Sequence, residues 1–134
     1  MFWLSHHYPD ELDRCYRLGP VHVCARCLGT YPVLFALFAA QVVAPELLAA
    51  VGLPLLLLLT APATLDWAYG RFRPHFGHNL WRSLTGALLG VALSRTLFLH
   101  IARHQPTWLL VQLGLVTAVA GPVILASYRR RRGG

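Results

Sequence analysis

Four apolar segments, each about as long as a bilayer is thick, dominate this chain of 134 residues. They cover residues 27–44, 46–65, 80–100 and 107–128. A helix needs ~20 residues to cross the ~30 Å hydrocarbon core. Only helices and closed barrels satisfy their backbone groups there. The sequence therefore predicts an all-α fold, an integral membrane bundle of four helices. A bundle of three crossing helices with a re-entrant first segment is the alternative.

Composition supports a membrane protein. Hydrophobic residues make up 56% of the chain and charged residues 13%. Soluble domains carry about 25% charged residues. These values exclude a disordered chain and disfavour a soluble globular domain. Only Pro45 separates the first two apolar segments, which predicts a tight helical hairpin between them.

The arginines predict the orientation in the membrane. The net charge is +7 and all 12 basic residues are arginines. Four crossings place ten of them on the side of both termini. These are Arg14, Arg17, Arg26, Arg71, Arg73, Arg82, Arg129, Arg130, Arg131 and Arg132. By the positive-inside rule, both termini and the loop of residues 66–82 lie in the cytoplasm, and the chain spans the inner membrane. The cations flank apolar segments, so we expect no nucleic-acid partner.

The predicted organisation is an N-terminal His/Cys segment, residues 1–26, followed by a four-helix transmembrane domain, residues 27–134. Gly86, Gly90 and Ser94 are spaced four residues apart in the third apolar segment. Small residues at this spacing let two helices approach closely. The expected partners are the lipid bilayer and, through this face, a helix of the same chain, a second copy or another membrane subunit.

The N-terminal segment carries a candidate metal site. All three cysteines, Cys15, Cys24 and Cys27, lie within thirteen residues, and His6 and His7 precede them. Zinc prefers four sulfur or nitrogen ligands, and a C-x2-C pair can turn both sulfurs toward one ion. The pattern predicts a cytoplasmic zinc site with three thiolates and His6 or His7. A redox-active pair of thiols, or thiols that act as small apolar groups, are the alternatives.

A second polar cluster lies at the end of the second apolar segment. Asp66 follows nineteen residues without a charge, and a carboxylate at that depth needs a partner or water. Arg82 opens the third segment at the same membrane face and is the expected partner. Asn79 can cap that helix, and the hydroxyl of Tyr31 can lie near both clusters. This cluster is either a structural ion pair or a ligand-binding or catalytic site.

Two blocks of the sequence resemble the domain-of-unknown-function 2085 family of small membrane proteins. The first block is His6-His7, then Arg14, then Cys24-Ala25-Arg26-Cys27-Leu28-Gly29-Thr30-Tyr31. The second is Asp66, Asn79, Arg82, Thr85 and Gly86. The chain departs from the family in His6-His7, where many members have Cys-His, and in Cys15, where a Ser is common. The resemblance implies a multi-helix membrane fold and no established activity.

Three functions are consistent with these patterns. The first is a structural or interaction module that carries the zinc site. The second is an enzyme that acts on a lipid headgroup through Asp66, Asn79 and Arg82 with the metal, since arginine suits bidentate contacts to phosphate. The third is a thiol–disulfide oxidoreductase that uses Cys24 and Cys27. Whether the protein is an enzyme is left open by the sequence.

Overall fold

The computed structural model describes residues 9–73 and 77–132. Along the chain it contains a short 3-10 helix, two strands and four helices. These are η1 (Pro9–Arg14), β1 (Cys15–Leu18), β2 (Val21–Cys24), α1 (Ala25–Val43), α2 (Leu53–Phe72), α3 (Asn79–Ala102) and α4 (Pro106–Arg132). The helical bundle is as expected, whereas the small antiparallel sheet corrects the all-α prediction.

The sheet is a hairpin that precedes the first helix. Cys15 pairs with Cys24 and Leu18 with Val21, and Gly19 turns the chain with a φ of +62°. Glycine adopts this left-handed conformation without a steric penalty. Both strands are four residues long; β2 contains Val21 and Val23 and β1 contains Tyr16, residue types that favour strands. The N-terminal segment is therefore built on a hairpin, which the all-α prediction lacked.

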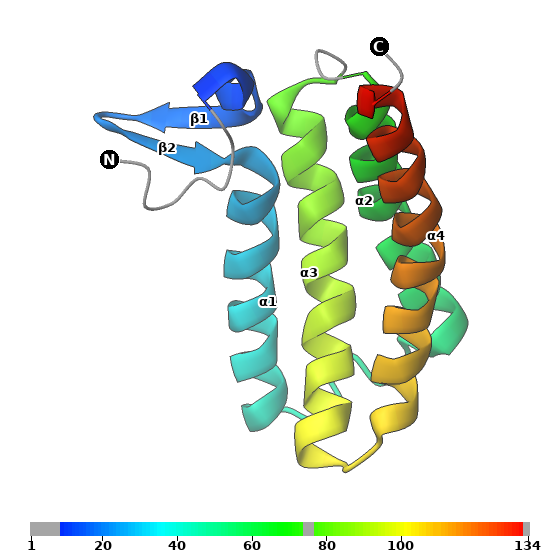
Figure 1. Cartoon of the computed structure of the whole chain (residues 1–134). Helices are drawn as coiled ribbons and strands as arrows, with labels where there is room; N and C mark the ends of the chain where they lie inside the picture. Colours follow the sequence, from blue (N-terminus) through cyan, green and yellow to red (C-terminus); the bar gives the residue numbers. More distant parts are fainter. Residues whose placement is uncertain (1–8, 74–76, 133–134) are drawn as a thin grey trace.

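The four helices run side by side, and α3 lies between α1 and the pair formed by α2 and α4 (Figure 1). The hairpin, the end of α2, the start of α3 and the end of α4 gather at one end of the bundle, called here the hairpin end (Figure 1).

Glycines bring α1 and α3 into close contact. A Cβ on Gly90 would lie 2.6 Å from the Thr30 carbonyl oxygen, and one on Gly86 would overlap the Arg26 carbonyl oxygen. On the other helix, a Cβ on Gly29 would overlap the Ser83 carbonyl oxygen. The predicted close contact at the small-residue face is confirmed, and its partner is α1 of the same chain.

Polar side chains fill much of the interior, while large apolar ones face outward. Gln41, Thr60 and Ser94 are fully buried. The Gln112 amide donates a hydrogen bond of 2.8 Å to the Thr60 hydroxyl, which joins α4 to α2. In contrast, Val43 is 86% exposed. Such a pattern suits a lipid environment, where apolar surfaces need no cover and small or polar residues join helices.

Three of the four helices are long and apolar enough to cross a membrane, namely α1, α3 and residues 106–130 of α4. The second helix is not among them; it carries Pro54, Pro62 and Asp66. Its start also differs from the prediction. Hydrogen-bonded turns follow Ala44, and α2 begins only at Leu53, after Gly52 and with Pro54 in its first turn. The predicted tight hairpin with a helix from residue 46 is thus wrong.

Candidate functional site

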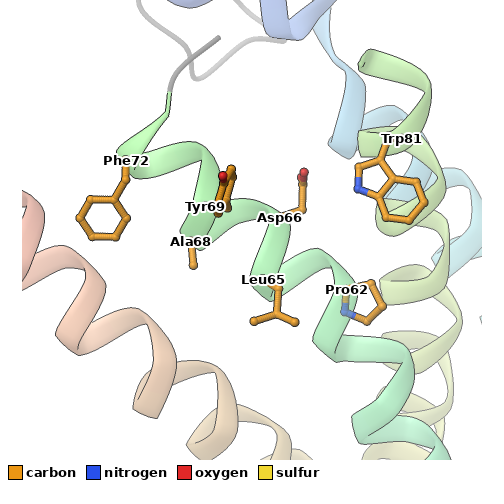
Figure 2. A pocket seen from close by; sticks show the side chains of 7 residues that line it. All are labelled: Pro62, Leu65, Asp66, Ala68, Tyr69, Phe72 and Trp81. Atoms are coloured by element: carbon orange, nitrogen blue, oxygen red, sulfur yellow. The ribbon is translucent and has the colours of Figure 1, made fainter. Parts of the chain in front are cut away.

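An apolar groove follows the second half of α2 toward the hairpin end. It has a volume of about 740 Å³, within the ~300–1,000 Å³ range of ligand pockets. Its lining consists of Pro62, Leu65, Asp66, Ala68, Tyr69 and Phe72 from α2 and Trp81 from α3 (Figure 2). Leu65 is 61% exposed and Trp81 is 54% exposed, so the groove is open to the surroundings of the bundle.

Asp66 connects this groove to a buried charged cluster. Its carboxylate forms an ion pair with the guanidinium of Arg26, which begins α1. Only 5% of the Asp66 side chain is exposed, compared with 23% for Arg26. The Nε of Arg26 is buried and has no hydrogen-bond partner among the described residues. Thus the sequence correctly marked Asp66 as a carboxylate that needs a cation, while Arg26 supplies the ion pair.

Arg82, the expected partner, lies beside this pair. Arg82 Nη2 and Asp66 Oδ1 each come within 3.9 Å of the position that a Cβ on Gly77 would take. Arg82 itself is only 6% exposed. The cluster therefore combines a buried carboxylate with two arginines from different helices.

Asn79 links this cluster to the hairpin. Its amide donates a hydrogen bond of 3.3 Å to the Cys15 carbonyl oxygen and accepts one of 3.4 Å from Arg82. The expected convergence of Asn79 and Arg82 is confirmed. The expected cap is wrong, since α3 begins at Asn79 itself and His78 occupies the cap position.

Further hydrogen bonds hold the N-terminal segment and α1 to the other helices. Arg14, at the end of η1, donates to the Gly70 carbonyl oxygen of α2 at 2.9 Å. The Ser83 hydroxyl of α3 donates to the Ala25 carbonyl oxygen of α1 at 2.9 Å and shares a hydrogen bond of 3.3 Å with the Tyr16 hydroxyl of β1. The N-terminal segment thus contacts α2 and α3 next to the charged cluster, and its position depends on residues that surround that cluster.

The three cysteines lie in one corner of the molecule. Strand pairing sets Cys15 opposite Cys24, and Cys27 follows in the first turn of α1. The Cys27 thiol interacts with the thiols of both other cysteines. However, within residues 9–73 and 77–132 no three His, Cys, Asp or Glu side chains are arranged to hold a metal ion. His6 and His7, the predicted fourth ligands, lie outside the described residues.

The remaining candidate is Tyr31. It is 53% exposed on α1, and its ring stacks on Phe35 with centroids 6.3 Å apart. Conversely, the sequence analysis did not single out Arg26 as the partner of Asp66, nor Pro62, Leu65 and Phe72 as lining a groove. In the sequence, only the position of Arg26 between Cys24 and Cys27 indicated that this arginine belongs to a polar cluster.

No curated protein and no solved structure matches the chain. Residues 14–97 match the family described as predicted membrane proteins, DUF2085. The match covers Cys24 to Tyr31 and the Asp66, Asn79 and Arg82 set, which are the blocks that carry the resemblance. It ends within α3 and so leaves α4 outside. The chain belongs to the DUF2085 family of predicted membrane proteins.

Proposed function

We propose that this protein binds a membrane amphiphile at the hairpin end, with the apolar tail in the α2 groove and the headgroup beside the Arg26–Asp66–Arg82 cluster. The observation that carries this proposal is the position of Asp66. It lines the apolar groove and at the same time forms the ion pair with Arg26. One site thus combines an apolar wall with charged groups, which is the chemistry of an amphiphile.

The dimensions of the groove suit a lipid tail. From Pro62 to Phe72 the helix rises by about 15 Å at ~1.5 Å per residue, or half of the ~30 Å hydrocarbon core. The lining is open along one side, as the exposure of Leu65 and Tyr69 shows. A tail within one leaflet can therefore enter sideways from the bilayer without passing through the bundle.

The charged cluster offers donors for a headgroup. Arg26 Nε has no partner among the described residues, and arginine forms bidentate bonds to phosphate. Asn79 and Arg82, which the sequence marked as a lipid-headgroup site, lie in the same cluster. The proposal is one of binding. Catalysis would need a reacting group at the headgroup, for which Asp66 is the candidate.

Photo-crosslinking in reconstituted vesicles tests this function. A phospholipid with a photoactivatable acyl chain should label residues 62–72 more strongly than other lipid-facing stretches. Ala68→Trp fills the groove without touching the ion pair and should remove this enrichment. Ala118→Trp, on an exposed part of α4, is the matched control and should retain it. Equal labelling of all exposed helices would contradict the proposal.

We also propose that Cys15, Cys24 and Cys27 bind zinc together with His6 or His7. The support is the sequence spacing of the three cysteines, the pairing of Cys15 with Cys24 and the place of Cys27 in the first turn of α1; binding would have to draw the three thiols together. A closed four-ligand site would be structural and would fasten the hairpin to α1. The hairpin contacts the charged cluster through Asn79, so the metal would stabilise the proposed headgroup site.

Elemental analysis of the detergent-purified chain tests the zinc proposal. About one zinc per chain is expected, because one such ligand set holds one ion. The variant Cys24→Ser/Cys27→Ser should lose it, and His100→Gln, at the opposite end of α3, should retain it. A wild-type chain without metal and with freely reactive thiols would favour the redox alternative instead.

A further inference from the structure

We infer that the ligand of the groove is an anionic phospholipid, selected by Arg73 and Arg130 at the cytoplasmic rim of the groove. This inference rests on the amphiphile-binding function proposed above and names its headgroup class. It starts from Arg73 and Arg130, which lie outside the Arg26–Asp66 pair and outside the family blocks.

Two arginines stack on the aromatic walls of the groove. The Arg73 guanidinium carbon lies 5.8 Å from the ring centroid of Tyr69, and that of Arg130 lies 5.3 Å from the centroid of Phe72. Both rings line the groove. Stacking on an aromatic ring keeps a guanidinium close to an apolar surface while its edge stays available for hydrogen bonds. The two cations therefore lie where the tail of a bound lipid meets its headgroup.

The rim comes from two helices that are far apart in the sequence. Arg73 directly follows α2, and Arg130 lies in the last turns of α4. Beside them, Arg71 donates a hydrogen bond of 3.4 Å from Nε to the Ser127 hydroxyl of α4. This contact joins the two helix ends, so the rim is a part of the fold and not of a free tail.

The stretch of sequence that supplies the rim arginines contains no acidic residue to balance their positive charge. All five acidic residues of the chain lie at or before position 66, and Asp66, the last of them, pairs with Arg26. No acidic side chain follows Asp66 in the sequence to neutralise Arg71, Arg73 or Arg130 from the same stretch of chain. A phosphate with net negative charge complements this rim, whereas a zwitterionic choline headgroup brings an additional cation.

Trp81 provides a reporter inside the groove, because it is the groove residue contributed by α3. The experiment uses the full chain with Trp3, Trp67 and Trp108 replaced by phenylalanine, reconstituted in vesicles. Phosphatidylglycerol or phosphatidylcholine with brominated acyl chains is titrated in. Bromine quenches tryptophan on contact. We expect phosphatidylglycerol to quench Trp81 at a lower mole fraction than phosphatidylcholine does.

Substitution of the rim tests its role directly. Arg73→Gln/Arg130→Gln should reduce the preference for phosphatidylglycerol by about fivefold for each arginine removed, as expected for basic side chains at an anionic surface. Arg17→Gln/Arg103→Gln lowers the net charge equally and leaves the rim intact. This control should keep the preference. An equal loss in both double variants would show a general charge effect and overturn the inference.

The outcomes separate the headgroup inference from the groove itself. Equal quenching of Trp81 by both lipids would show an occupied groove without headgroup selection, and so overturn only the inference. A second variant keeps Trp108 as its single tryptophan. If the brominated lipids quench Trp81 no more strongly than they quench Trp108, the groove is not a lipid-binding site and the proposed function is wrong as well. Displacement of the brominated lipid by soluble glycerol phosphate would show that the rim binds phosphate without a tail, which also contradicts an intact lipid as the ligand.

Discussion

Arg26 at the start of α1 and Asp66 in α2 form an ion pair that joins two helices, each packed against α3. Their side chains are 23% and 5% exposed, respectively. A buried carboxylate of this kind is stable only while a cation accompanies it, since desolvation of one charge alone is costly. The pair therefore joins α1 to α2 at the hairpin end, beside the groove.

Removal of one partner should destabilise the fold more than removal of both. We expect Arg26→Met to lower the free energy of unfolding by about 3–5 kcal/mol, because it leaves a buried carboxylate unpaired. The double variant Arg26→Met/Asp66→Leu should recover most of this loss. Denaturation in detergent with increasing dodecyl sulfate measures both values.

The exposed ion pair at the other end of the bundle is the control. Arg103 and Glu46 approach to 3.9 Å with side chains 54% and 82% exposed. The variant Arg103→Gln should cost less than about 1 kcal/mol, as is usual for surface pairs. If Arg26→Met and Arg103→Gln lower the free energy of unfolding by similar amounts, the buried ion pair stabilises the fold no more than the exposed one.

The contact between α1 and α3 predicts that added methyl groups are not tolerated there. Gly90→Ala places a Cβ 2.6 Å from the Thr30 carbonyl oxygen, so the helices must separate. We expect a loss of about 1–3 kcal/mol, as in overpacked cores. Gly114→Ala on α4 meets no atom within 4 Å and should be neutral or slightly stabilising. Thermal melting of both variants in the same detergent decides the prediction.

The hydrogen bond from Arg95 to Gln41 should stabilise the buried charge of Arg95 inside the bundle. Arg95 is 9% exposed and donates a hydrogen bond of 3.3 Å to the fully buried Gln41, while its Nε has no hydrogen-bond partner in the part of the chain that the structure describes. Gln41→Leu removes that acceptor and should cost about 1–3 kcal/mol. The double variant Gln41→Leu/Arg95→Leu should recover this stability, because it no longer places a charge at this buried position. Additive losses in the double variant would contradict this coupling.

The strand register predicts which cysteines can form a disulfide. Opposite residues of antiparallel strands have Cα atoms ~4.5–5.5 Å apart, within the range of disulfides. In the Cys27→Ser variant, mild oxidation should therefore link Cys15 to Cys24, and mass spectrometry of peptides should find the linked pair. Zinc added beforehand should slow the reaction if these thiols bind it. Linkage between different chains only would contradict the hairpin.

The sequence predicted the helices best where a single physical requirement dominates. Long apolar stretches must be helical in lipid, so α3 and α4 begin within one residue of the predicted segments at 80 and 107. The start of α2 was missed because Leu47 to Val51 are apolar but form turns, with Gly52 as the break. The strands were missed because four-residue strands in a polar segment leave too short a pattern to recognise.

The candidate site was predicted in its residues but not in its pairing. A carboxylate at the end of an apolar helix needs a cation, and that requirement pointed to Asp66 correctly. Arg26 and Arg82 both come close to Asp66. The contacts of Gly29, Gly86 and Gly90 bring the start of α1 against α3, which places Arg26 within reach of that carboxylate. The groove was not predicted, because it depends on how side chains of α2 and α3 lie in the folded chain, and the sequence of α2 has no periodic pattern that marks these residues.

Native mass spectrometry of the chain released from native membranes tests the groove most directly. The wild-type chain should retain a phospholipid through mild detergent. Ala68→Trp should lose it, and Ala118→Trp should keep it, because only the first substitution fills the groove. If the wild-type chain and Ala68→Trp carry the same lipids in the same amounts, the groove is not a binding site and the proposed function is wrong.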